Sequence, residues 1–176
     1  MTRIIAGTHG GRRLQVPPGT GTRPTADRAR EGLFSSLLSL MDLEGAQVLD
    51  LYAGSGALGL EAVSRGAGAA TLVEDDPIAA RVIRKNAEDL GLAATVVEAD
   101  VSTFLAGPPS PYPLVVADPP YAVDLDLQAV LPWLEPDGVL VVERATRGPG
   151  PVVPEALEEL RSRRYGEATL WYFRRS

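Results

Sequence analysis

The sequence of 176 residues predicts an α/β fold, a mostly parallel sheet with helices on both faces. Short apolar runs that read as buried strands, such as 47–51, 70–73 and 114–117, alternate with segments of helical periodicity. This alternation is typical of a parallel sheet wound on both faces. A chain of this length buries roughly 70% of its unfolded surface, which is enough for one core.

We therefore expect a single domain over residues 1–176, with a basic N-terminal extension over 1–42 and the main α/β core over 43–176. In the extension, residues 3–7 and 12–16 are joined by a glycine-containing turn over 8–11. This pattern predicts a short β-hairpin.

A helix is expected next, with Thr25 as its N-cap and Asp27 in the first turn, where the helix dipole favours a carboxylate. Its apolar stripe, which predicts core packing, consists of Leu33, Phe34, Leu37, Leu38 and Met41.

The core begins with a buried strand that runs into Gly54-x-Gly56-x-x-Gly59 and then into a helix. Glycines in such a loop let the backbone approach a ligand closely, and a dinucleotide-binding enzyme carries the same pattern. Asp50 stands four residues before the first glycine. A carboxylate there would repel a pyrophosphate but suits the cationic amine and sulfonium of S-adenosylmethionine, so the sequence favours the latter ligand.

Acidic residues follow the next two predicted strands. Glu74 lies 18 residues past Gly56, well placed to bind two ribose hydroxyls of either ligand. Asp76 is interpreted as the N-cap of a helix that starts at Pro77 and stops at Gly91. Asp100 follows the strand 95–99, where its carboxylate is expected to accept from an adenine amino group.

The tetrapeptide Asp118-Pro119-Pro120-Tyr121 ends the apolar run 114–117. It offers one carboxylate, one carbonyl whose direction is fixed by proline, and one flat ring. The Asp118 side chain and the Pro119 carbonyl are suited to accept both protons of an exocyclic amine, and Tyr121 to stack on an extruded base. The alternative is an ordinary proline-rich turn with a surface tyrosine.

The remaining elements complete the sheet. We expect a helix over 125–134, a fifth buried strand over 138–143 and a loop over 146–154. Residues 165–174 supply strand material for a closing hairpin, whose two strands should be antiparallel to each other.

The net charge of −6 is unevenly distributed. Residues 1–30 hold six arginines against one aspartate, and residues 161–176 hold five arginines against one glutamate. This asymmetry indicates a local phosphate footprint. Arg23 and Arg28 are interpreted as groups that reach substrate or cofactor, although they and Arg30 also suit a solvated helix face.

Several classes of protein are disfavoured. The chain has no cysteine, so the sequence indicates a cytoplasmic protein without disulfides or thiolate metal sites. We see no metal-ligand spacing and no run long enough to cross a membrane. The single histidine, His9, falls on a turn. A methyl transfer from S-adenosylmethionine to an exocyclic amine needs no strong general base.

The chain resembles the RsmD family of bacterial 16S rRNA guanine-N2 methyltransferases over nearly its whole length. The segments that carry the resemblance are 3–7 with 11–12, 23–31, 50–62 and 118–121. Arg23-Pro24-Thr25 discriminates best, because many amino methyltransferases share the glycine loop and Asp-Pro-Pro-Tyr. Tyr52 stands where the general class has glycine, so the ligand loop must be shaped differently here.

The resemblance implies a class I, Rossmann-like methyltransferase fold with a seven-stranded sheet, S-adenosylmethionine as cofactor, and 16S rRNA in the small ribosomal subunit or an assembly intermediate as partner. The expected catalytic residues are Asp118, Pro119, Pro120 and Tyr121. The expected cofactor-binding residues are Asp50, Tyr52, Ala53, Gly54, Ser55, Gly56, Gly59, Glu74, Asp100 and Val101. The expected RNA contacts are Arg3, Arg12, Arg23, Thr25 and Arg28.

Three alternatives stay open at this point. An adenine-N6 methyltransferase would use the same Asp-Pro-Pro-Tyr but needs a target-recognition region for which the chain has little room. An NAD-type oxidoreductase would share the glycine loop. A non-catalytic RNA-binding module would bind rRNA without transferring a methyl group.

Overall fold

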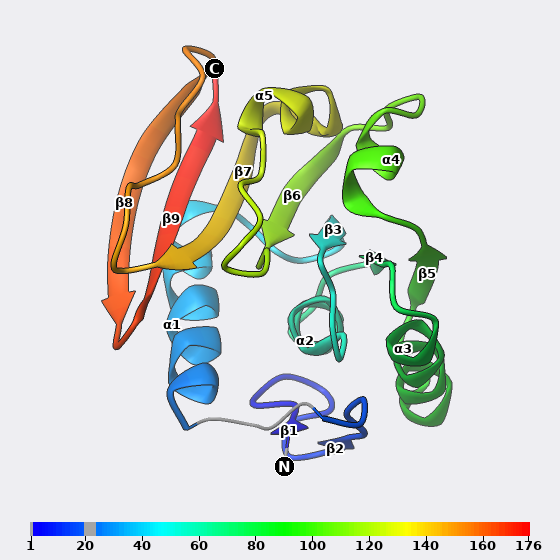
Figure 1. Cartoon of the computed structure of the whole chain (residues 1–176). Coiled ribbons are helices and arrows are strands. Elements are labelled where there is room, and N and C mark those ends of the chain that lie inside the picture. Colours follow the sequence, from blue (N-terminus) through cyan, green and yellow to red (C-terminus); the bar gives the residue numbers. More distant parts are fainter. Residues whose placement is uncertain (1, 20–23) are drawn as a thin grey trace.

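The computed structural model describes residues 2–19 and 24–176, with the side chains of Pro24 and Thr25 left outside the description. Its centre is a seven-stranded sheet in the order β5-β4-β3-β6-β7-β9-β8 (Figure 1). The strands are β3 (Gln47–Leu51), β4 (Ala69–Glu74), β5 (Ala94–Glu98), β6 (Tyr112–Ala117), β7 (Leu134–Ala145), β8 (Leu157–Tyr165) and β9 (Ala168–Arg175).

Five of these strands pair in parallel, and β9 runs in the opposite direction to both of its neighbours. β3 pairs in parallel with β4 and β6, and the parallel pairing extends to β5 on one side and β7 on the other. β9 pairs antiparallel with both β7 and β8. The prediction of a mostly parallel, seven-stranded Rossmann-like sheet with an antiparallel closing hairpin is therefore confirmed.

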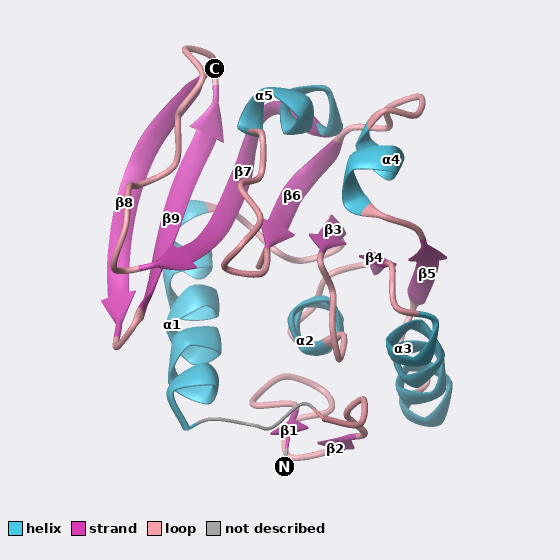
Figure 2. Cartoon of the chain, in the orientation of Figure 1, coloured by secondary structure: helices cyan, strands magenta, loops and turns pink. Residues whose placement is uncertain are grey.

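Helices cover both faces of the sheet, as expected (Figure 2). On one face α1 (Pro24–Leu40), α2 (Ala57–Ser64) and α3 (Pro77–Leu90) share a core cluster with side chains such as Leu72 and Val141. On the other face α4 (Val101–Leu105), α5 (Leu127–Val130) and the 3-10 helix η1 (Leu131–Trp133) pack with Val73 and Val142. Successive strand residues alternate between the two clusters, which is why the strands read as continuous apolar runs.

Helix α1 differs from its prediction at two points. It begins at Pro24, so Thr25 is its second residue and not its N-cap. Leu38, expected in the apolar stripe, is 61% exposed, whereas Ser36 is buried. At 3.6 residues per turn the buried arc is centred near Leu33 and Leu37 and extends toward Ser36, which leaves Leu38 on the outer side.

The helix expected over 125–134 is wrong in length. Asp126 caps α5 by accepting from the Gln128 N–H at 3.0 Å, but α5 has only four residues and passes into the 3-10 turn at Leu131. Pro132 lacks the N–H that would continue the α-helical ladder, which accounts for the change. The strand expected over 138–143 is correspondingly longer, and the closing hairpin takes its first strand from 157–165, upstream of the predicted segment.

The N-terminal hairpin forms, but β1 (Thr2–Arg3) and β2 (Arg13–Leu14) have two residues each. The reason is a buried glutamate on α2. Glu61 accepts from the backbone N–H groups of Ile5 at 2.8 Å and Ala6 at 3.0 Å, so these groups are withdrawn from the hairpin.

The same segment lies directly against α2. Gly7 has φ +86°, and a Cβ there would lie 1.9 Å from the Ser64 carbonyl oxygen. The buried Arg30 forms an ion pair with Glu61 at 3.5 Å and donates to the Arg3 carbonyl. The hairpin is thus held against the core by α1 and α2, and Arg30 has a structural role.

Candidate functional site

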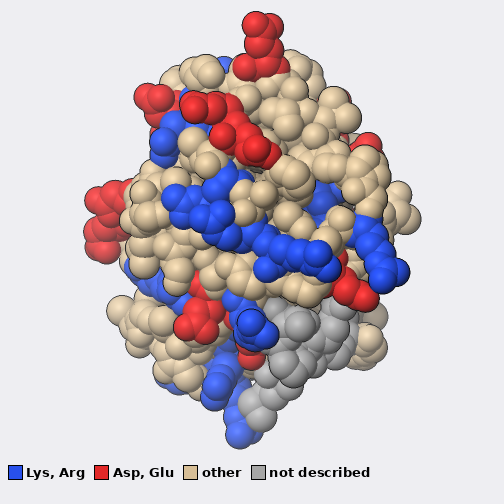
Figure 3. Space-filling model, turned by 90° about the vertical axis from the view of Figure 1, so that its left-hand side faces the viewer, with Lys and Arg blue, Asp and Glu red and all other residues tan. Residues whose placement is uncertain are grey.

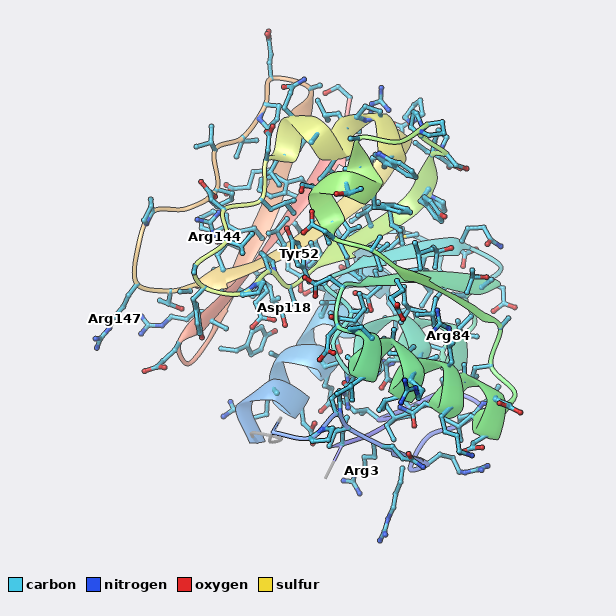
Figure 4. The ribbon with its side chains drawn as sticks, turned by 45° about the vertical axis from the view of Figure 1, so that its right-hand side comes forward. Arg3, Tyr52, Arg84, Asp118, Arg144 and Arg147 are labelled. Atoms are coloured by element: carbon cyan, nitrogen blue, oxygen red, sulfur yellow. The ribbon has the colours of Figure 1, made fainter. Side chains whose placement is uncertain are left out.

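Two cavities meet at the carboxyl ends of the parallel strands. The first lobe has a volume of about 890 Å³ and is lined by residues that follow β3, β4, β5, β6 and β7. The second lobe, of about 460 Å³, lies between the glycine loop, α1 and the turn that joins β8 to β9. Both lobes are lined by Tyr52, Gly54, Asp118, Tyr121 and Glu143. Figure 4 shows Tyr52 and Asp118 near each other at the centre of this region.

The glycine loop has an unusual backbone. Tyr52, Gly54 and Gly56 have φ of 61°, 61° and 82°, in the left-handed region. For Tyr52 this conformation costs on the order of 1–3 kcal/mol, a strain that clusters at functional sites. A Cβ on Gly54 would meet no atom within 4 Å, whereas one on Gly59 would lie 2.8 Å from the Leu72 side chain. Gly54 therefore leaves room beside the cavity, and Gly59 allows α2 to pack closely on the sheet.

Asp50 lies beneath this loop and does not line either lobe. Its side chain is buried, and its Oδ2 accepts from the Gly59 N–H at 2.9 Å. The other oxygen, Oδ1, has no hydrogen-bond partner. Burial raises the pKa of the Asp50 carboxyl to about 8, and the nearby Asp118 and Glu74 carboxylates add to the rise. A cationic ligand group nearby would favour the ionised form of this carboxyl, whereas a phosphate would disfavour it further.

Glu74 ends β4 and is oriented by the backbone. Its Oε1 accepts from the Gly54 N–H at 2.7 Å, and its Oε2 accepts from the Asp76 N–H at 2.9 Å. Burial raises the pKa of the Glu74 carboxyl. It lines the first lobe together with Asp75, which sequence reasoning missed although it directly follows the predicted strand-end acid. The predicted capping by Asp76 is confirmed, with Oδ1 accepting from the Ile78 N–H at 3.0 Å.

Asp100 and Val101 also line the first lobe. Asp100 is the N-cap of α4, and its Oδ2 accepts from the Ser102 hydroxyl and from the Thr103 N–H at 3.2 Å. These hydrogen bonds lower the pKa of the Asp100 carboxyl. All of these hydrogen bonds are accepted by Oδ2. Asp100 therefore caps α4 and also lines the cavity.

The Asp118–Tyr121 segment directly follows β6, and all four of its residues line the first lobe. The Val123 N–H donates to the Pro120 carbonyl at 2.9 Å, which closes the turn. Arg144 at the end of β7 forms an ion pair with Asp124 at 2.8 Å and so ties this loop to the neighbouring strand. Tyr121 is 69% exposed, which leaves its ring face accessible.

Sequence reasoning missed Glu143, Arg144 and Arg147, which line the first lobe from β7 and the loop after it. It also missed Tyr165 and Glu167 on the wall of the second lobe. Glu143 had a usable signal, because it is an acid at the end of a predicted strand, like Glu74 and Asp118. The residues of the β8–β9 turn had none, since their position depends on the strand order.

The predicted RNA contacts are not brought together at the site. Arg3, Arg12 and Arg28 are exposed, and Figure 4 shows Arg3 pointing outward, away from Asp118. Arg23 and the side chain of Thr25 lie outside the described residues.

The arginines of the C-terminal segment divide into two groups. Arg174 donates to the Leu40 carbonyl, and Arg175 to the carbonyls of Leu131 and Leu134, so both support the fold. Arg163 and Arg164 are exposed on the edge strand β8. Figure 3 looks at this side of the molecule and shows basic side chains gathered in a band across it.

Across residues 2–19 and 24–176, no helix has the length and apolarity needed to span a bilayer. Within the same described part, no three His, Cys, Asp or Glu side chains form a group suited to hold a metal ion.

The model of a protein family described as conserved hypothetical protein 95 matches residues 2–174. The chain belongs to this family. The resemblance to the RsmD family is thereby confirmed, and relatives with that name are similar over most of their length. Ribosomal RNA small subunit methyltransferase D of Escherichia coli is 41% identical over 86% of this chain and 79% of its own.

The enzyme of the same name in Haemophilus influenzae is 37% identical over 80% of this chain and 77% of its own. Among solved structures, an Escherichia coli protein assigned as a methyltransferase superposes with a TM-score of 0.87 at 37% identity, covering 99% of this chain and 98% of that one. The class I methyltransferase fold expected from the sequence is confirmed by this likeness.

Proposed function

We propose that the protein transfers a methyl group from S-adenosylmethionine to the exocyclic N2 amine of a guanine in 16S rRNA of the small ribosomal subunit. The observation that carries the proposal is the position of Asp118 and Tyr121 on the shared wall of two lobes. One lobe has the strand-end acids that suit a nucleoside cofactor. The relatives named as small-subunit rRNA methyltransferases support the reaction class.

The residues of the first lobe fit S-adenosylmethionine. Glu74 is held by two N–H groups and presents its remaining lone pairs to ribose hydroxyls. Asp100 and Val101 would border the adenine, and the loop 52–56 would carry the methionine portion, with Gly59 supporting the loop through its hydrogen bond to Asp50. The positive charge of that portion would favour the ionised form of the buried Asp50, whose Oδ1 has no hydrogen-bond partner. When bound, this cofactor supplies an electrophilic methyl group on a sulfonium.

The protein's part in the reaction is to hold the amine. The Asp118 carboxylate and the Pro119 carbonyl would accept hydrogen bonds from the two N2–H groups, which favours a pyramidal nitrogen with its lone pair directed at the methyl group. Tyr121, exposed at the shared wall, stacks on the base. The amine becomes strongly acidic after transfer, so no strong base is needed and positioning is the main catalytic contribution, worth several kcal/mol.

The alternatives have less support. Asp50 and Glu74 place two buried carboxyl groups around the glycine loop, which disfavours the pyrophosphate of a nicotinamide cofactor. A module that only binds RNA would not need an amine holder beside a cofactor-sized cavity. An adenine-N6 target uses the same holder and is distinguished from guanine below.

We infer that RNA phosphates contact the exposed arginines around the site. Arg3, Arg12 and Arg28, with Arg23 and Thr25, remain the proposed contacts, and Arg163 and Arg164 on β8 extend the surface. On this proposal residues 1–176 act as one cytoplasmic methyltransferase domain, with 1–42 as its RNA-binding extension. The substrate is the small subunit or an intermediate in its assembly.

The test is to map methylated nucleosides in 16S rRNA from cells with and without the gene, complemented by wild-type protein or by Asp118→Ala. We expect one N2-methylguanosine to depend on the wild-type protein. The D118A protein should bind S-adenosylmethionine with nearly wild-type affinity but restore no methylation. Full activity of D118A, or a methylated adenine at the gene-dependent position, would contradict the assignment.

A further inference from the structure

Glu143 lies next to Asp118 across two parallel strands. The register pairs Ala117 of β6 with Val142 of β7, so Asp118 and Glu143 are the following residues of this pair. Side chains alternate along a strand, and Ala117 and Val142 point into the core cluster of α4 and α5. Glu143 therefore points to the opposite face, toward α1 and α2. Its partner on β9, Leu170, lies in the core cluster of that face.

Part of the wall of the second lobe is apolar and suits contact with the face of a base. Ala26, Ala29 and Leu33 of α1 line one side, and Leu58 of α2 and Leu170 of β9 line others. Its walls also include the polar side chains of Thr2, Asp27, Arg30, Tyr165 and Glu167. At the junction with the first lobe it is lined by Asp118, Tyr121 and Glu143. A base extruded from RNA would place a face against these apolar side chains and its polar edge toward the carboxylates of Asp118 and Glu143.

The hydrogen-bonding pattern of the base then decides which one fits. Guanine presents the N1–H donor beside its N2 amine, whereas the corresponding ring nitrogen of adenine or of 2,6-diaminopurine is an acceptor. An ionised carboxylate only accepts hydrogen bonds. With the amine held by Asp118 and Pro119, a second carboxylate on the neighbouring strand matches the adjacent N1–H.

We propose that Glu143 selects guanine by accepting from its N1–H while the base occupies the second lobe. The inference rests on the proposed function and adds to it the residue that distinguishes guanine from other bases with an exocyclic amine. Glu143 acts on specificity. Asp118 holds the reacting amine, and Tyr121 stacks on the ring.

The experiment uses small ribosomal subunits reconstituted from 16S rRNA with either guanine or 2,6-diaminopurine at the mapped position. Both bases carry the N2 amine, and only guanine has the N1–H. Wild-type protein should prefer guanine by at least tenfold in kcat/KM. In Glu143→Gln the amide can donate to the diaminopurine N1, so this preference should fall at least tenfold. The matched control is Glu135→Gln, an exposed glutamate at the start of the same strand, which should leave the preference unchanged.

The outcomes are distinct. Two results would overturn the role of Glu143 and leave the methyltransferase assignment intact: an equal kcat/KM of the wild-type protein on both bases, or an equal loss of kcat/KM on both bases in E143Q. No transfer to guanine by wild-type protein that binds S-adenosylmethionine would overturn both. If E143Q fails to bind the cofactor, Glu143→Asp decides, since it keeps the carboxylate and must keep the preference for guanine even at a reduced kcat.

Discussion

Replacing Glu61 by alanine should detach the N-terminal hairpin from the core. Glu61 is fully buried and accepts from the N–H groups of Ile5 and Ala6, and it forms ion pairs with Arg65 at 2.8 Å and Arg30 at 3.5 Å. Both arginines are largely buried as well. The substitution would therefore remove an ion-pair partner from both arginines and the acceptor from two backbone N–H groups.

The magnitude follows from these contacts. Removing one partner of a buried ion pair costs about 3–5 kcal/mol, because the other charge stays buried without compensation. For a domain of this size each kcal/mol lowers Tm by about 2–4 °C, so Glu61→Ala should lower Tm by roughly 6–20 °C. Glu61→Gln keeps one accepting oxygen, so its Tm should lie between those of Glu61→Ala and the wild type.

Hydrogen exchange measures the detachment directly. The amides of Ile5 and Ala6 should exchange much faster in E61A, while those of the central strand β3 keep their protection. Glu61 does not line either lobe, so S-adenosylmethionine binding should persist and rRNA affinity should fall with the loss of an ordered hairpin. The control is Glu88→Ala, an exposed glutamate on α3. Unchanged protection of Ile5 and Ala6, with Tm within about 2 °C of wild type, would refute the reasoning.

Two further predictions concern charge. Burial raises the Asp50 pKa from 3.8 to about 8 in the folded protein. The contribution of protonated Asp50 to the free energy of unfolding is therefore fully present below pH 4 and is lost as pH rises to 8. Asp50→Asn should remove this loss in the cofactor-free protein, so its free energy of unfolding at pH 7 should exceed that of the wild type by about 4 kcal/mol. If the free energies of unfolding of both proteins, measured with urea, change in parallel from pH 5 to 8, the prediction is contradicted. Replacing Arg163 and Arg164 by alanine should reduce the slope of log K for rRNA against log salt by roughly 1–2. Replacing the exposed Arg84 of α3 by alanine should leave this slope unchanged. Equal slopes in the wild type, the Arg163 and Arg164 variant and the Arg84 variant would exclude β8 from the RNA-binding surface.

The sequence predicted the parts of the site that depend on local chemistry. Strand-end acids such as Glu74 and Asp118 are visible because a buried strand ends where its apolar run ends, and parallel strands bring those ends to one edge. The helix caps at Asp76 and Gly91 were predicted for the same reason, since capping is decided within four residues.

Other predictions failed where a distant residue competes with a local preference. Residues 3–7 have the pattern of a longer strand, but Glu61 captures two of their N–H groups. The sequence separation is 56 and 55 residues, so no local pattern signals it. The position of Asp50 was not visible in the sequence either: its hydrogen bond to Gly59 holds it beneath the loop, so its predicted role toward the cofactor, which stays a prediction, would act through the loop.

The second lobe is the clearest case of a feature that only the topology creates. β9 inserts between β7 and β8 and pairs antiparallel with both. As a result Leu170 lies beside Glu143, and Gly166 and Glu167 of the β8–β9 turn line the second lobe together with α1. Had the closing hairpin joined the sheet through β8, the exposed arginines of that strand would face Glu143 in place of Leu170. The strand order thus keeps these arginines at the outer edge of the sheet, where we propose that RNA phosphates bind, and places Glu143 and Leu170 beside each other at the second lobe.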